Sequence, residues 1–244
     1  METEPTGPPY DFLGGALLLI DKPQGWTSFD VVNKVRYRLK KALGIKKIKV
    51  GHSGTLDPMA TGLLVLCTGK WTKRLTELTG LDKQYTGTLK LGETTPSYDA
   101  DTKVDEIFPT DHITPVMVHA ATAEFVGDLQ QVPPVFSAIK VDGQPLYKRA
   151  RKGEKVEVKS RQVRVDRFEI TGVDVPDVHF AVDCGKGTYV RSLAYDLGRA
   201  LDSGAHLTAL RRTRVGIYDL ADAWNLDDLL QHIDDNAAPA ADQG

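Results

Sequence analysis

The chain has 244 residues, of which 41% are hydrophobic and 26% charged, and its net charge is −2. That length suits one large domain, or one domain with a small insertion. The first residues, METEPTGPPYDF, lack the basic and apolar regions of a signal peptide, and no apolar run approaches the roughly 20 residues of a membrane span. Cys67 and Cys184 both lie in apolar stretches, as buried thiols of a reducing compartment do. The composition therefore predicts a soluble cytoplasmic protein.

The first half of the chain alternates short apolar runs with one amphipathic helix. Ser28 is a plausible N-cap for this helix, which Gly44 ends, and 85–91 alternates apolar and polar residues as a half-buried strand does. A constrained loop is expected over 51–58, and the polar, acidic stretch 92–110 is expected to be a longer loop. The expected elements in this half are strands at 16–20, 48–51, 63–66 and 85–91 and a helix at 28–43.

The second half continues the mixture of strands and helices. Thr114 and Pro115 start a helix that should reach Phe125, because threonine caps well and proline suits the first helical position. The paired prolines after Gln131 exclude regular structure over 130–137. The remaining expected elements are a short basic helix at 146–152, a strand or hairpin at 156–170, a strand at 178–184, a helix at 189–201, a structured stretch at 206–216 and a helix at 226–233. Most strands are joined by turns, so we expect an α+β fold with a mostly antiparallel sheet.

The charge is unevenly distributed. Residues 219–244 contain seven aspartates and no lysine or arginine, which leaves +5 for the rest of the chain. Basic residues gather in two clusters, at 34–49 and 148–167. Such clusters bind polyanions by neutralising phosphates. Solvated helix faces would show the same pattern, so charge alone leaves both interpretations open.

The most informative segment is GHSGTLDPMATGLL, residues 51–64. Its three glycines and one proline specify a backbone path rather than a core element. Pro58 disfavours helical geometry at Asp57 and favours an extended conformation, which would hold the carboxylate on a constrained loop. Taken alone, Leu-Asp-Pro would more often be an Asx-type turn in which the aspartate only caps the backbone.

The whole string resembles the catalytic signature of the TruB-type tRNA pseudouridine synthases, which modify uridine 55 of the T loop. Four further segments, in order along the chain, resemble other motifs of that family. They are GALLLIDKPQGWTS (15–28), DKQY with the following LG (82–92), QVPPVFSAIK with later residues to Gly153 (131–153) and GKGTYVRSL (185–193). The resemblance runs from about residue 15 to 216.

This resemblance implies the fold, the domains and the partner. It implies the pseudouridine-synthase catalytic fold over 15–236, a central mixed, mostly antiparallel sheet flanked by helices, with an inserted basic flap at about 130–162 that clamps RNA. Residues 1–14 are expected to be disordered or loosely packed, and 237–244 disordered. Many relatives carry a further RNA-binding domain. Only about 28 residues follow Gly216 here, and this segment is acidic, so we expect no room for such a domain. We therefore expect a shortened enzyme that acts as a monomer and without a guide RNA. Its expected partner is the T stem-loop of tRNA.

The resemblance also implies the site residues. Asp57 would be the nucleophile, Arg191 its ion-pair partner and Tyr85 the ring under the flipped base. His52 would occupy the space that the base leaves, and Asp99 would brace Arg191. Lys22 would buttress the catalytic loop or touch phosphate. Thr55 and Tyr189 complete the expected substrate-binding set.

Pseudouridine formation is an isomerisation, so it transfers no electrons and no phosphate. We accordingly expect no metal and no cofactor, and His52 and the cysteines lack a zinc spacing. Three alternatives stay open. One is a non-catalytic RNA-binding or tRNA-folding protein on the same scaffold. Another is an aspartate-dependent hydrolase of nucleosides or glycosides, although that reaction would want a second carboxylate. The third is a pseudouridine synthase that acts on another uridine or another RNA.

Overall fold

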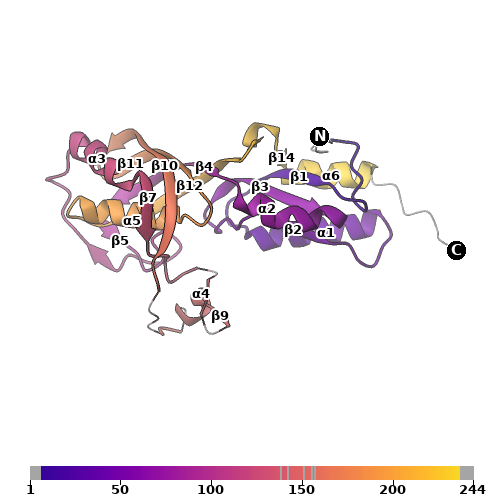
Figure 1. Cartoon of the computed structure of the whole chain (residues 1–244), viewed down its shortest axis with the longest axis horizontal. Helices are drawn as coiled ribbons and strands as arrows, with labels where there is room; N and C mark the ends of the chain where they lie inside the picture. The colour runs from indigo at the N-terminus through magenta and orange to yellow at the C-terminus, as the bar shows by residue number, and fades with distance from the viewer. Residues whose placement is uncertain are drawn as a thin grey trace. The chain divides into compact units, whose positions relative to one another are not determined.

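The computed structural model describes residues 7–137, 139–141, 143–150, 152–154, 156 and 158–236. The chain packs into two compact units, Met1–Lys83 with Arg211–Gly244, and Gln84–Leu210 (Figure 1). The single catalytic domain predicted over 15–236 spans both units. Strands β4 (Lys83–Leu91) and β12 (Ala205–Val215) contribute residues to both units.

The first unit is built on a small mixed sheet. Its strand order is β14 (Trp224–Asn225), β1 (Leu17–Lys22), β3 (Thr61–Thr68) and β12, with β2 (Val50–His52) paired to β3 and β13 (Tyr218–Asp219) paired to β12. The pair β1–β3 is antiparallel, whereas β1–β14 and β3–β12 are parallel. Its helices are α1 (Ser28–Ala42), α2 (Leu75–Gly80) and α6 (Leu226–Asn236), with 3-10 turns η1 (Gly69–Arg74) and η3 (Leu220–Asp222).

Both faces of β1 and β3 are covered, which explains their continuous apolar runs. Leu18 and Leu64 belong to a buried cluster that includes residues of α1 and α6. Leu19 and Val65 belong to the other cluster, with Leu78 of α2. The sheet is thereby fixed in the middle of a layered core, and the loop between β2 and β3 starts from a rigid base.

Several predicted boundaries in this unit shift by a few residues. The N-cap of α1 is Thr27 rather than Ser28, because Thr27 and Asp30 form a capping box in which each side chain accepts from the other's backbone. Packing also begins before Gly15, contrary to the expected loose N-terminus. Phe12 is only 5% exposed in the cluster under α1, and Trp224 donates to the Tyr10 hydroxyl. Residues 1–6 and the tail 237–244 lie outside the described residues.

The second unit has a sheet of the order β12, β4, β11 (Asp177–Cys184), β10 (Arg161–Asp174) and β7 (Gly127–Gln131). Its helices include α3 (Pro115–Ala121), continued by η2 (Thr122–Phe125), and α5 (Val190–Ala200). The predicted loop 92–110 contains one small antiparallel pair, β5 (Glu93–Thr94) with β6 (Glu106–Ile107). The mixed, mostly antiparallel sheet flanked by helices confirms the predicted α+β fold.

The insertion leaves the sheet at the end of β7 and returns at the start of β10. It contains β8 (Lys140–Val141), β9 (Gln144–Pro145) and α4 (Leu146–Ala150), the short basic helix of the prediction (Figure 1). The strand predicted from 156 starts only at Arg161, where β7 offers a pairing partner. Parts of the predicted flap lie outside the described residues, namely Ala138, Asp142, Arg151, Lys155 and Glu157. None of the described helices combines the length and apolar character that a membrane span requires.

Candidate active site

The loop that carries Asp57 connects two paired strands. β2 and β3 are antiparallel neighbours, with His52 opposite Leu66, so both ends of the loop are anchored in the sheet. Gly54 and Gly62 have φ values of 103° and 98°, in the region that favours glycine. A Cβ on Gly62 would lie 2.3 Å from the backbone oxygen of Arg212, so glycine is required there for close approach. The carboxylate-bearing Asp57 is half-buried in this loop.

Side chains from elsewhere in the first unit hold the loop backbone. The Ser28 hydroxyl accepts from the Leu56 N–H at 2.8 Å and lies 3.2 Å from the Leu56 carbonyl, to which it donates. Gly25 donates its N–H to the Pro58 carbonyl at 2.8 Å. The residues on both sides of Asp57 are therefore fixed by hydrogen bonds, which leaves the aspartate little freedom to move.

Lys22 and Arg212 are buried cations beside this loop. The Lys22 ammonium, on a residue with no exposed surface, donates to the carbonyls of Pro23 and Trp26 at 2.9 and 2.6 Å and lies 3.5 Å from that of Pro58. These contacts join Lys22 to the segment before α1 and to the residue after Asp57. Arg212 is 1% exposed and donates to the carbonyls of Leu63 and Gly54 at 2.7 and 3.2 Å. It connects the two ends of the loop.

Removing the Ser28 hydroxyl tests this support. In Ser28→Ala, the buried N–H and carbonyl of Leu56 lose their partner, so we expect a loss of about 1–3 kcal/mol in the free energy of unfolding. Urea denaturation measures this loss. Ser160→Ala removes an exposed hydroxyl and should leave the midpoint unchanged. Equal midpoints for Ser28→Ala and wild type would show that the loop does not depend on this contact.

His52 is half-buried at the start of the loop, whereas Thr55 is exposed. Among the described residues, the buried Nδ1 of His52 has no hydrogen-bond partner. Burial lowers the pKa of His52 and the Arg212 charge adds to this, while the nearby Gly54 backbone acts in the opposite direction. At neutral pH the ring is therefore an uncharged aromatic surface.

The lowered pKa of His52 predicts a stability change with pH. Below about pH 6.5 the unfolded chain binds a proton that the folded histidine does not bind, so the free energy of unfolding falls as the pH drops through that region. In His52→Gln this contribution is absent. The decrease in melting temperature between about pH 7.5 and pH 5.5 should thus be smaller than in wild type. The control is His119→Gln, at an exposed position. A decrease as large as that of wild type in His52→Gln would contradict the prediction.

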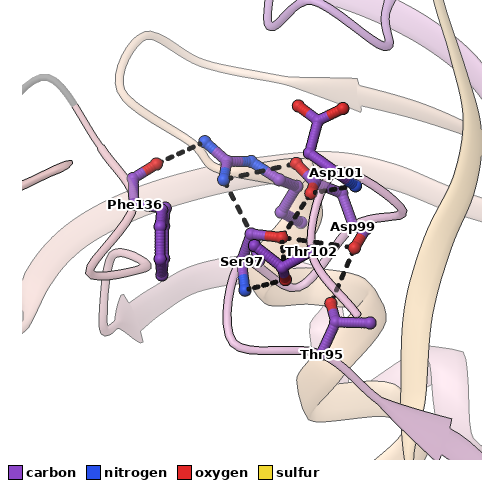
Figure 2. Close-up of polar contacts among 7 residues, drawn as sticks. Thr95, Ser97, Asp99, Asp101, Thr102 and Phe136 are labelled. Carbon is purple, nitrogen blue, oxygen red and sulfur yellow. Dashed lines mark hydrogen bonds and ion pairs between the residues drawn. The ribbon is translucent and has the colours of Figure 1, made fainter. Parts of the chain in front are cut away.

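Arg191 is the centre of a buried polar network in the second unit. It is the second residue of α5 and 4% exposed. Its guanidinium donates to the carbonyls of Ser97 and Phe136 at 2.9 and 3.0 Å, and lies 3.4 Å from an Asp99 carboxylate oxygen (Figure 2). The sequence predicts that Asp99 braces Arg191, and the structure places the two groups together.

Asp99 is itself held in place. It is 1% exposed, and one carboxylate oxygen accepts from the Ser97 hydroxyl at 2.5 Å and from the Asp101 N–H at 3.0 Å (Figure 2). The preceding Tyr98 adopts a φ of 61°, uncommon for a residue with a side chain. Tyr98 stacks on Tyr195 of α5, with ring centroids 4.0 Å apart. The loop before Asp99 is thus fixed to the helix that carries Arg191.

The two predicted aromatic residues also belong to the second unit. Tyr85 lies on β4 and is 9% exposed. Tyr189 is the N-cap of α5, and its ring faces the guanidinium carbons of Arg161 and Arg191 at 4.6 and 5.9 Å. Of the predicted site residues, the structure groups Lys22, His52, Thr55 and Asp57 in the first unit, and Tyr85, Asp99, Tyr189 and Arg191 in the second. The predicted pairing of Asp57 with Arg191 stays a prediction.

Sequence reasoning missed the supporting roles of Ser28 and Arg212. No signal in the sequence marks Arg212 as buried, because alternation along 205–215 places it on the same face as His206, Thr208 and Arg214. Ser28 was interpreted as a helix cap, which its neighbour Thr27 supplies. Within the stretches that the structure describes, no three histidine, cysteine, aspartate or glutamate side chains gather as metal ligands would.

Comparison with known proteins identifies the class of enzyme. Solved chains of a Cbf5–Nop10–Gar1 complex, and of an H/ACA RNP bound to a substrate RNA containing 2′-deoxyuridine, match with TM-scores of 0.67 and 0.64 at 28% and 26% identity. Each match covers 94% of this chain. It covers only 61% of the chain from the Cbf5–Nop10–Gar1 complex and 60% of the chain from the H/ACA RNP. The fold is that of a pseudouridine synthase.

The family is defined by sequence. Residues 40–190 match the model of the N-terminal domain of the TruB family of pseudouridylate synthases, and residues 191–241 match the model of the tRNA pseudouridylate synthase B C-terminal domain. The chain belongs to the TruB family, and it is an enzyme that isomerises uridine to pseudouridine. This excludes the hydrolase and the non-catalytic alternatives. The second match includes the region after Gly216, where no further domain was expected.

Individual relatives match over nearly their whole length. The tRNA pseudouridine synthase B of Flavobacterium johnsoniae is 54% identical over 219 residues, which cover 89% of this chain and 96% of the relative. That of Parabacteroides distasonis is 54% identical over 206 residues, covering 84% and 88%.

Proposed function

We propose that this enzyme converts uridine 55 in the T loop of tRNA into pseudouridine, with Asp57 as the nucleophile. The names of its bacterial relatives support tRNA as the substrate. The observation that carries the role of Asp57 is the fixed loop around it. Leu56 and Pro58, on either side of the aspartate, are both held by hydrogen bonds to other segments. A reacting carboxylate needs such preorganisation.

The reaction rearranges atoms without an outside reactant. The N1–C1′ bond breaks, the freed uracil turns, and C5 bonds to C1′. C5 then loses its proton and N1 gains one, so product and substrate are isomers. Carboxylates form covalent glycosyl adducts, so Asp57 can attack C1′ as the bond to N1 breaks, and the bond to Asp57 breaks in turn when C5 bonds to C1′. Removal of a sugar proton by the same carboxylate, followed by readdition, is the second route, and both fit this site.

The other side chains bind and orient the base. The target uridine is stacked within the T loop and must be extruded before it can react. We assign Tyr85 as the ring on which the flipped uracil rests and His52 as the uncharged ring that fills its former place. Arg191, braced by Asp99, orients the nucleophile, since a guanidinium presents two donors to a carboxylate. Lys22 supports the loop, and Thr55 and Tyr189 contact the RNA.

Tritium release tests the proposal. tRNA transcript labelled with tritium at C5 of uridine is incubated with the protein, and each turnover at a uridine releases one tritium to water. Mapping of the product should place pseudouridine at position 55, and a transcript with cytidine at that position should release none. Release from the altered transcript would favour the remaining alternative, a synthase for another uridine or another RNA.

The proposal includes a stand-alone enzyme of the cytoplasm. The bacterial relatives match over almost their entire length, whereas the solved Cbf5 complexes contain chains that this one covers by about three fifths. A monomer without guide RNA should therefore suffice for activity. Size-exclusion chromatography of the active protein, with light scattering, should give the monomer mass near 26.8 kDa.

A further inference from the structure

The insertion begins after Gln131 and ends before Arg161, and both of these residues contact the segment just before Arg191. β7 ends at Gln131 and β10 begins at Arg161, and these two residues are register partners. The Arg161 guanidinium donates to the Gly187 carbonyl and lies 4.6 Å from the Tyr189 ring. Both ends of the insertion therefore contact residues 187–189, just before Arg191.

Gln131 makes the more specific contact. Its side-chain amide donates to the Tyr189 carbonyl at 3.1 Å and accepts from the Tyr189 N–H at 2.8 Å. Gln131 is 2% exposed, so these bonds are shielded from water. Tyr189 is the N-cap of α5 but provides no side-chain cap of its own. The start of this helix is thus fixed by a residue that belongs to the insertion.

The contact continues along the first turn of α5. The Ser192 hydroxyl donates to the Val132 carbonyl at 2.8 Å. Arg191 donates to the Phe136 carbonyl at 3.0 Å (Figure 2). The segment from Gln131 to Phe136 therefore follows the helix start, and the arginine side chain itself bonds to it.

We infer that Gln131 is a positioning residue for Arg191, and that through it the RNA-clamping insertion sets the orientation of this arginine. The inference rests on the proposed function, in which Arg191 orients Asp57. The chemistry explains why glutamine stands here. A side-chain amide carries both N–H donors and an acceptor oxygen, so it can bond to the C=O and the N–H of a single backbone residue. Leucine offers neither, and glutamate has the same shape but no donor for the Tyr189 carbonyl.

The test compares Gln131→Leu and Gln131→Glu with wild type on labelled tRNA. We expect kcat to fall about 10–100-fold, because a displaced orienting group costs rate, while the Kd for tRNA stays within about twofold. The matched control is Asp128→Asn, at an exposed position of β7 before the flap, which should keep wild-type kcat. Thermal unfolding verifies that each variant is folded. Should Gln131→Leu fail to fold, the same-shaped Gln131→Glu carries the test.

The outcomes separate this inference from the proposed function. A folded Gln131 variant with wild-type kcat overturns the inference alone. So does a loss that lies entirely in tRNA affinity, since Gln131 would then serve binding and not the arginine. Wild-type protein that forms no pseudouridine in tRNA overturns the proposed function, and this inference with it.

Discussion

Asp57→Asn protein should form pseudouridine at a rate at least about 10⁴-fold below wild type, because an amide cannot act as the nucleophile. Asparagine has the same shape as aspartate, and the hydrogen bonds that hold Leu56 and Pro58 involve neither carboxylate oxygen of residue 57. The variant should therefore fold normally. Single-turnover tritium release with excess enzyme measures the chemical step directly.

Binding provides the control for this prediction. tRNA affinity of Asp57→Asn should stay within about tenfold of wild type, because phosphate contacts supply most of the free energy of RNA binding. Asp111→Asn changes an exposed aspartate outside the site and should keep wild-type activity. Tritium release by Asp57→Asn at the wild-type rate would refute the assignment of the nucleophile. Lost binding together with lost activity would instead indicate a structural role.

The elements were predictable wherever local patterns decide them. Thr114 and Pro115 predicted the start of α3, and the apolar run before Asp21 predicted β1. Boundaries that depend on contacts with distant segments were not predictable. β10 starts at Arg161 because β7 pairs with it there, and no property of residues 156–160 specifies that point. The ordered structure begins before Gly15 because Tyr10 accepts a hydrogen bond from Trp224, which is more than 200 residues away in the sequence.

The candidate site shows the same division. The glycines and proline around Asp57 predicted a constrained loop, since they act through the local backbone. The residues that fix this loop come from other elements. Ser28 lies on α1 and Arg212 on β12, and each contacts the loop through a side chain that could equally have faced solvent. Only the packing shows that a threonine caps α1 and leaves this serine free to hold Leu56.

Replacement of Arg191 should impair both stability and catalysis. Arg191→Met leaves the carboxylate of Asp99, 1% exposed, without its cation, and breaking one side of a buried ion pair costs about 3–5 kcal/mol. Arg191→Lys keeps the charge, but a single ammonium cannot match the planar guanidinium that meets Asp99 and two carbonyls. We expect kcat of the lysine variant to fall by about 10²–10³-fold.

Single-turnover rates measure the loss of catalysis, and urea unfolding measures the loss of stability. Arg199→Met, at an exposed position of the same helix, should change neither. A lysine variant with wild-type kcat would show that position 191 supplies only charge, and that the fixed geometry of its network does not serve the reaction.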